Sequence, residues 1–244
     1  MTHNPLIFAL DYDNGRDAVG MAAVLHGVVG MFKIGLELYV SEGPQILHEI
    51  APFGDIFLDV KMCNIPTTVE RALKHLGQLA KLRGALKFTT VHAFGGEKMM
   101  SAAVAAVAPA QVLAVTVLTS MNAATLVEVG VRDAYTDVMV ERQVLRLAQL
   151  AHKAGCGGVI CAPPDLLTLK THIPDGFLYV TPGVRPQGAD VGDQARVATP
   201  EGAMEEGADY LVVGRPIRDA KDPVLAAKAI LEEACAARAR RAAG

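Results

Sequence analysis

Short apolar runs rich in β-branched residues alternate along the whole chain with longer runs of helical character that are rich in Ala and Leu. The apolar runs predict strands near residues 6–11, 31–35, 55–60, 86–91, 111–118, 157–161, 178–181 and 210–213. The segments between them predict helices near 15–27, 41–50, 66–83, 97–107, 137–154, 164–171, 200–206 and 222–240, with a further short helix at 122–130. Near-continuous apolar strands joined by helical crossovers are typical of a parallel sheet that is buried on both faces.

Eight such units in 244 residues favour an α/β fold of the closed (β/α)₈ type, a TIM barrel. The alternative is an open, doubly wound sheet, which usually has fewer strands and a glycine-rich first turn. The first turn, LDYDNGRDA at 10–18, has no GxGxxG, and no GxxxxGK occurs anywhere in the chain. No linker or low-complexity segment divides the sequence, so we expect a single barrel domain over residues 1–244. Predicted helix starts carry Ser41, Pro66 and Thr199 as caps or first-turn residues.

Composition argues against several classes of protein. The net charge is −3, and basic residues cluster only in the tail at Arg238, Arg240 and Arg241, so we expect no nucleic-acid binding. No run reaches the ~18 apolar residues of a membrane span, and the N-terminus does not have the pattern of a signal peptide. The four cysteines show no CxxC spacing, and the seven histidines lack the paired spacing of a metal site. We therefore expect a cytoplasmic protein with reduced thiols, no membrane association, and no metal or cofactor.

Charged residues end several of the predicted strands, where a parallel barrel carries its reactive groups. Asp11, Lys33, Asp59 and Lys61 all occupy such positions. Asp59 and Lys61 are two residues apart, so on an extended strand they face the same side, and Lys33 holds the equivalent place on a neighbouring strand. A carboxylate between two ammonium groups favours the charged form of both. The pattern indicates either a structural ion-pair network or an acid that protonates a carbon or oxygen as it becomes anionic.

Anion-binding residues follow the last two predicted strands, the usual location of a phosphate site in such barrels. Arg215 follows Gly214, which lets backbone N–H groups approach an anion, and its guanidinium group matches phosphate oxygens. Arg185, Gln187 and Gln194 are further donors on the loop at 183–198; the alternative is an ordinary solvated loop.

Two other strand ends carry weaker signals. A single histidine such as His92 is more often a hydrogen-bonded structural residue than a catalytic one. The pair Thr119 and Ser120 either binds the edge of a heterocycle or simply ends a strand.

Ordered motifs at these strand ends resemble the orotidine 5′-phosphate decarboxylase family over essentially the whole chain, and bacterial members most closely. The motifs are FALD at 8–11, FKIG at 32–35, DVKMCNIPTT at 59–68, TVLTSM at 116–121, TPGVRPQGADVGDQARVATP at 181–200 and VVGRPI at 212–217. The resemblance implies a homodimeric barrel with its active site at the subunit interface. It also implies removal of CO₂ from orotidine 5′-phosphate to give UMP, the last step of de novo pyrimidine biosynthesis, without metal or cofactor.

The resemblance further implies roles for individual residues. Lys61 matches the family's proton donor to C6, and Lys33 and Asp59 match the charged network around it. Asp11 matches a contact to the ribose and Thr119 a contact to the pyrimidine. The remaining expected substrate-binding residues are Thr68, Pro182 and, at the phosphate end, Arg185, Gln187 or Gln194, Gly214 and Arg215.

Asn64 departs from the family pattern Asp-x-Lys-x-x-Asp, because this chain reads Asp59 to Asn64 as DVKMCN. In the family the second Asp reaches across the dimer interface and completes a Lys–Asp–Lys–Asp row. We interpret Asn64 as an engineered Asp→Asn substitution that impairs activity, with natural divergence as the alternative.

Two rival functions remain open. Sugar-phosphate lyases and decarboxylases of the same superfamily share the motif, but they carry Glu where this chain has Lys33 and use Mg²⁺. A lysine is not a ligand for Mg²⁺, which takes oxygen donors. The other rival is a catalytically dead nucleotide-binding protein, although such a protein would have no reason to keep Lys33, Asp59 and Lys61.

Overall fold

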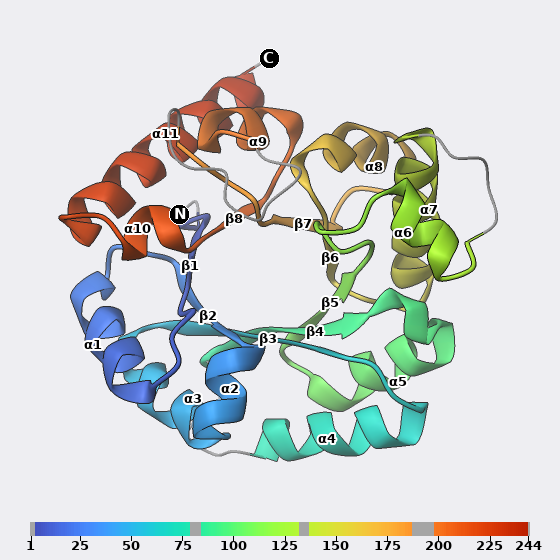
Figure 1. The fold of residues 1–244 in the computed structure, drawn as a ribbon, viewed down its shortest axis with the longest axis horizontal. Helices are drawn as coiled ribbons and strands as arrows, with labels where there is room; N and C mark the ends of the chain where they lie inside the picture. The colour runs from blue at the N-terminus through green and yellow to red at the C-terminus, as the bar shows by residue number, and fades with distance from the viewer. Residues whose placement is uncertain (1–2, 79–83, 132–136, 187–197, 244) are drawn as a thin grey trace.

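The computed structural model describes residues 3–78, 84–131, 137–186 and 198–243. Eight parallel strands close a barrel in chain order, each paired with the next and the last with the first (Figure 1). The expected (β/α)₈ fold is therefore confirmed. The strands are β1 (Leu6–Ala9), β2 (Met31–Gly35), β3 (Asp55–Met62), β4 (Leu86–His92), β5 (Gln111–Val115), β6 (Gly158–Ile160), β7 (Leu178–Thr181) and β8 (Tyr210–Val213).

Helices surround the strands as an outer ring (Figure 1). The α-helices are α1 (Gly15–Leu25), α2 (Leu36–Glu42), α3 (Gln45–Ile50), α4 (Pro66–Gln78), α5 (Glu97–Val107), α6 (Ala123–Glu128), α7 (Asp137–Lys153), α8 (Leu166–His172), α9 (Pro200–Glu206), α10 (Arg215–Arg218) and α11 (Pro223–Ala243). Short 3₁₀ helices are η1 (Ala51–Phe53), η3 (Ala93–Gly95) and η4 (Pro163–Asp165). None of the described helices is both long enough and apolar enough to cross a membrane.

The helix predicted at 41–50 is the main error in the predicted elements. The segment forms α2 and α3 instead, separated by Gly43 at φ 67° and Pro44. A left-handed glycine followed by proline ends one helix and starts another. The predicted cap at Ser41 is consequently wrong, because its hydroxyl donates to the Leu38 carbonyl at 3.2 Å inside the last turn of α2.

Thr199 caps α9 as predicted. Its Oγ1 accepts a hydrogen bond from the Gly202 N–H at 3.1 Å, and Pro200 occupies the first turn. Pro66 likewise begins α4. The four-residue α10 was not predicted, because a single turn after a strand leaves no helical periodicity to detect.

Two apolar layers hold the barrel together. The larger layer packs the outward faces of the strands against the helices. The smaller one fills the interior with Ile7, Ala9, Met31, Phe57, Phe88, Leu113, Val180 and Val212. The rings of Phe57, Phe88 and Tyr210 meet edge to face, with centroids 6.0 and 5.3 Å apart. A filled interior leaves the carboxyl ends of the strands as the place for polar groups.

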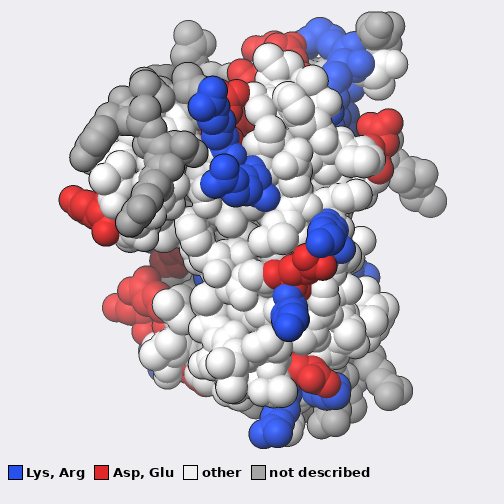
Figure 2. All heavy atoms as spheres, turned by 90° about the vertical axis from the view of Figure 1, so that its right-hand side faces the viewer, with Lys and Arg blue, Asp and Glu red and all other residues white. Residues whose placement is uncertain are grey.

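Surface charge is mixed on the face drawn in Figure 2. Basic and acidic side chains of the described residues lie interspersed there across a largely uncharged surface.

Candidate active site

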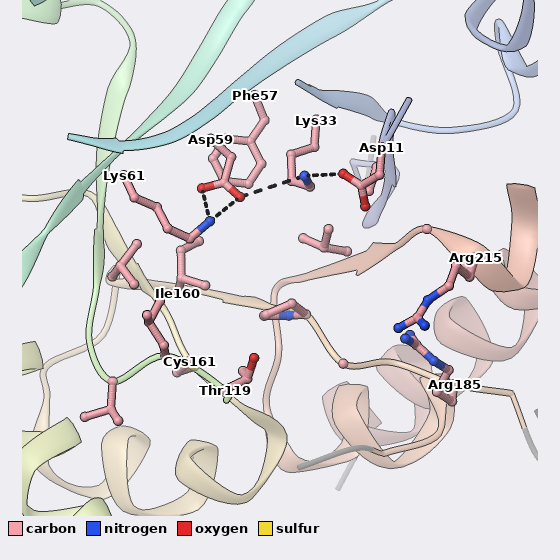
Figure 3. Close-up of a pocket in the computed structure, with 18 of the residues that line it drawn as sticks. Asp11, Lys33, Phe57, Asp59, Lys61, Thr119, Ile160, Cys161, Arg185 and Arg215 are labelled. Carbon is pink, nitrogen blue, oxygen red and sulfur yellow. Dashed lines mark hydrogen bonds and ion pairs between the residues drawn. The ribbon is translucent and has the colours of Figure 1, made fainter. Parts of the chain in front are cut away.

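A cavity of ≈ 390 Å³ opens at the carboxyl ends of the strands (Figure 3). It brings together most of the side chains that the sequence singled out, although they come from distant parts of the chain. The predicted residues that line it are Asp11, Lys33, Asp59, Lys61, Thr119, Pro182, Arg185, Gly214 and Arg215.

Four charged side chains of alternating sign form a continuous row along one wall of this cavity (Figure 3). The Lys33 Nζ lies 3.0 Å from Asp11 Oδ1 and 3.9 Å from Asp59 Oδ2. The Lys61 Nζ lies 2.9 and 2.8 Å from Asp59 Oδ1 and Oδ2. The structure thus brings Lys33, Asp59 and Lys61 together and adds Asp11 at the end of the row. Each ammonium group has a carboxylate beside it, which offsets the cost of placing these charges in a barrel mouth.

Burial differs along this row. The side chains of Lys33 and Asp59 are each 11% exposed, whereas Lys61 is 38% exposed. The wall around them is apolar and includes Phe57, Ile160 and Val212. Lys61 is therefore the more open of the two ammonium groups, and it lies where low polarity strengthens electrostatic interactions with a bound molecule.

Two glycines make room for the inner end of the row. A Cβ at Gly35 would lie 3.1 Å from Lys33 Nζ and 3.4 Å from Asp11 Oδ1. A Cβ at Gly214 would lie 3.3 Å from Asp11 Oδ2. The lack of a side chain at both positions lets the Asp11–Lys33 pair close against the backbone.

A bulge in β3 positions Asp59 and Lys61. Leu58 pairs with Thr89 and Met62 with Val91, so four steps along β3 correspond to two along β4. Lys61 has φ 46° and is the only non-glycine residue at positive φ in the described part of the chain. The sequence predicted a regular extended strand here. The two side chains do meet, but on an irregular, strained segment.

Two guanidinium groups approach one another on the opposite side of the cavity. Arg185 follows β7 and Arg215 begins α10, and Figure 3 shows their ends directed toward each other. Arg185 is buried, and its Nη1 donates to the Val184 carbonyl at 2.9 Å. Converging positive groups at the strand 7 and strand 8 loops suit a phosphate group.

Arg218 also lines the cavity, although it was not predicted as a site residue from the sequence. Its Nη1 donates to the backbone carbonyl of Asp11 at 2.9 Å, and its Nε and Nη2 reach the Asp219 carboxylate at 2.7 and 3.2 Å. The hydrogen bonds that Arg218 donates to the Asp219 carboxylate raise the pKa of Arg218 above its usual value. Its spacing of three residues after Arg215 was the available signal, since that spacing places both on one side of a helical turn.

Some predicted residues lie outside this cavity. Asn64 and Thr68 are exposed and do not line it, and the Asn64 Oδ1 accepts a hydrogen bond from the Ile65 N–H at 2.8 Å. Gln187 and Gln194 lie outside the described residues.

His92 differs from expectation. Its buried Nδ1 has no hydrogen-bond partner among the described residues, so the expectation of a hydrogen-bonded structural histidine is wrong for that atom. Burial, together with the nearby charge of Lys61, lowers the pKa of His92.

No group of three or more His, Cys, Asp or Glu side chains in the described ranges is arranged to hold a metal ion. Between the carboxylates of Asp11 and Asp59 lies the ammonium group of Lys33.

Comparison with known proteins gives a consistent result. The sequence model of the Orotidine 5'-phosphate decarboxylase / HUMPS family matches residues 4–230. A relative from Anaeromyxobacter sp. (strain K), named Orotidine 5'-phosphate decarboxylase, is 47% identical over 224 residues, which cover 91% of this chain and 94% of the relative. A relative of the same name from Trichlorobacter lovleyi is 42% identical over 238 residues, covering 94% and 95%. The crystal structure of Orotidine 5'-phosphate decarboxylase from Lactobacillus acidophilus superposes with a TM-score of 0.80 at 37% identity, covering 95% of this chain and 99% of that one.

Proposed function

The chain belongs to the orotidine 5′-phosphate decarboxylase family, and from this membership we infer that it is a carboxy-lyase that converts orotidine 5′-phosphate to UMP and CO₂ in pyrimidine biosynthesis. The structural observation that carries the assignment is the arrangement of charged side chains around one cavity. An alternating Asp–Lys–Asp–Lys row forms one wall, and two converging arginines lie across from it. A nucleotide with a charged base at one end and a phosphate at the other matches this layout.

We propose that Lys61 protonates C6 of the pyrimidine. Loss of CO₂ leaves the electron pair of the broken C–C bond on C6. That pair then forms a C–H bond with a proton from the Lys61 ammonium group. Lys61 then regains a proton from water. Asp59 holds the ammonium group at 2.8 Å, and Lys33 on its other side keeps that carboxylate in place. Charge that develops on C6 is offset by groups already oriented before the reaction begins.

The proposed substrate contacts follow the geometry of the cavity. Asp11, half exposed at the end of the row, is available to the ribose, and Thr119 to the pyrimidine. Arg185 and Arg215 take the phosphate. The proposed set further includes Pro182, Gly214 and, outside the described residues, Gln187 or Gln194.

We also propose that the chain acts as a homodimer with the site at the interface. Asn64 and Thr68 are exposed and lie outside the cavity, Asn64 just after β3 and Thr68 in the first turn of α4. Large apolar side chains are exposed after three consecutive strands: Val40 after β2, Ile65 after β3 and Phe94 after β4. A contiguous exposed apolar patch marks an interaction site, and we propose that these three side chains belong to one that a partner covers. A second copy there would bring Asn64 and Thr68 to the neighbouring active site.

Two further expectations stay part of the proposal. We propose one domain over residues 1–244, since the described elements from β1 to α11 all build one barrel. We propose a cytoplasmic location because all four cysteines are free thiols. Burial raises the pKa of Cys156 to about 12, which keeps that thiol unreactive.

A magnesium-dependent sugar-phosphate lyase is not favoured. The Lys33 ammonium group lies between the two carboxylates that a divalent cation would have to share. A cation next to that ammonium group would meet direct repulsion.

The test is the loss of orotidine 5′-phosphate absorbance in single-turnover experiments on the parent chain and on Asn64→Asp. We expect the parent to be slower by about 10²–10³-fold, because it lacks one preorganised charge, while UMP affinity is retained. Asn64→Ala is the matched control, since it removes the amide without adding charge and should not gain speed. Equal rates in the parent and Asn64→Asp would remove residue 64 from the mechanism. Absence of turnover in both, with UMP still bound, would leave a nucleotide-binding protein.

A further inference from the structure

Thr90 joins the two charged residues of the β3 bulge to the neighbouring strand. It lies on β4 and is fully buried. Its Oγ1 is 2.9 Å from the backbone nitrogen of Lys61 and 3.0 Å from Asp59 Oδ1. One hydroxyl therefore contacts both the backbone that carries the proposed proton donor and the carboxylate that holds it.

The direction of both hydrogen bonds follows from the chemistry of the partners. A backbone N–H only donates, so the Thr90 hydroxyl accepts from Lys61. An ionised carboxylate only accepts, so the same hydroxyl donates its single proton to Asp59. Both capacities are used at once, and Asp59 Oδ1 accepts hydrogen bonds from both the Thr90 hydroxyl and the Lys61 ammonium group.

The bulge explains why a side chain is needed at this point. Regular pairing of β3 with β4 stops at Leu58 and resumes at Met62, so the Lys61 N–H bonds to the Thr90 side chain at a point where the ladder is interrupted. Lys61 also has φ 46°, a conformation unfavourable for a residue with a Cβ. Such a conformation persists only where the surroundings hold it.

The preceding threonine shows that this arrangement is specific. Thr89 is equally buried, but its hydroxyl has no hydrogen-bond partner among the described residues. Successive side chains of a strand face opposite sides, so only Thr90 faces the row. Thr89→Val is therefore a matched control for Thr90→Val, with the same strand, burial and change of atoms.

We propose that Thr90 is a positioning residue for decarboxylation, which fixes the strained backbone of Lys61 and the carboxylate of Asp59 through one hydroxyl. The proposal rests on the proposed function of Lys61 as the proton donor. Thr90 does not line the cavity, so its effect reaches the reaction through Lys61 and Asp59.

The kinetic test compares Thr90→Val, Thr90→Ser and Thr89→Val in the parent chain. Thr90→Val should lower kcat by about 10–100-fold, since a displacement of ~1 Å at a reacting group can cost about 10²-fold. KM for orotidine 5′-phosphate should change little, because the arginines at the far end are untouched. Thr90→Ser keeps the hydroxyl and should restore most of kcat, and Thr89→Val should match the parent. A kcat of Thr90→Val equal to that of the parent chain, or a Thr90→Ser variant no faster than Thr90→Val, would overturn the proposal.

A second readout needs no substrate. Amide hydrogen exchange measured by NMR should show faster exchange at Lys61 in Thr90→Val, with the Val91 amide unchanged. General loss of stability would instead raise exchange at both amides. Unchanged protection of Lys61 would overturn the positioning role even if kcat fell. If the parent chain and Asn64→Asp do not turn over orotidine 5′-phosphate, the proposed function fails, and the exchange result still decides whether Thr90 holds Lys61.

Discussion

Replacing Asp59 with Asn removes one negative charge from between two ammonium groups and changes the size of the side chain very little. The carboxylate lies 2.8 Å from Lys61 Nζ and 3.9 Å from Lys33 Nζ. An amide oxygen in the same place can still accept the hydrogen bond from Thr90. The substitution therefore tests charge rather than packing.

The expected loss of stability follows from burial. Removing one partner of a buried ion pair costs about 3–5 kcal/mol, because the remaining charge is left uncompensated. Lys33 keeps Asp11 at 3.0 Å, and Lys61 is 38% exposed and can turn toward water. We therefore expect the lower limit, about 3 kcal/mol. For a chain of this size each kcal/mol shifts Tm by about 2–4 °C, which predicts a decrease of about 6–12 °C.

The assay combines thermal and urea melts with single-turnover kinetics, the latter in the Asn64→Asp background. Turnover should fall by about 10²–10³-fold, because Asp59 holds the proposed proton donor. Glu97→Gln is the matched control. It makes the same carboxylate-to-amide change in the exposed Glu97–Lys153 pair, whose atoms are 2.8 Å apart. Exposed pairs contribute about 0–1 kcal/mol, so this variant should melt close to the parent and keep full activity.

Two results would refute the reasoning. If Asp59→Asn is as stable as Glu97→Gln, the carboxylate does not compensate the two ammonium groups. If it is destabilised but turns over as fast as the Asn64→Asp chain, the row contributes to folding and not to the reaction.

Other predictions test the remaining parts of the site. Lys61→Ala should abolish single-turnover decarboxylation in the Asn64→Asp background, beyond the ~10²–10⁴-fold of ordinary general acid catalysis; retention of most activity would rule out Lys61 as the proton donor. Arg215→Ala should weaken UMP binding by about 10–150-fold, the equivalent of one charge-assisted hydrogen bond at about 1.5–3 kcal/mol, and calorimetry showing equal affinity would place the phosphate elsewhere. The pKa of His92 is lowered by burial and by the charge of Lys61, so below about pH 6.5 the folded chain binds fewer protons than the unfolded chain. The free energy of unfolding should therefore fall as pH decreases through that value. His92→Phe should reduce this dependence in urea melts, and identical pH curves for the two chains would contradict it.

The barrel could be read from the sequence because its signals are local. A buried parallel strand needs an unbroken apolar run, and a crossover needs a helix, so eight repeats of that pattern leave few alternatives. Gly43 and Pro44 were the visible breakers that the prediction at 41–50 overlooked. The site residues at strand ends were readable for the same reason, because a charge directly after an apolar run is conspicuous.

What only the tertiary structure decided is the pairing between distant segments. Arg218 donates to the carbonyl of Asp11 across 207 positions of sequence, and Lys33 binds Asp11 across 22. Such contacts depend on how the closing barrel sets the register of its strands, and no local pattern encodes that register.

The β3 bulge is the clearest case of the same limit. The sequence shows Asp59 and Lys61 two residues apart, which determines that their side chains can meet. It does not show that β3 gains two residues against β4, that Lys61 takes φ 46°, or that the Thr90 hydroxyl completes the interrupted ladder. A strained backbone is unfavourable by itself, so it exists only because contacts from another strand hold it, and those contacts form only in the folded barrel.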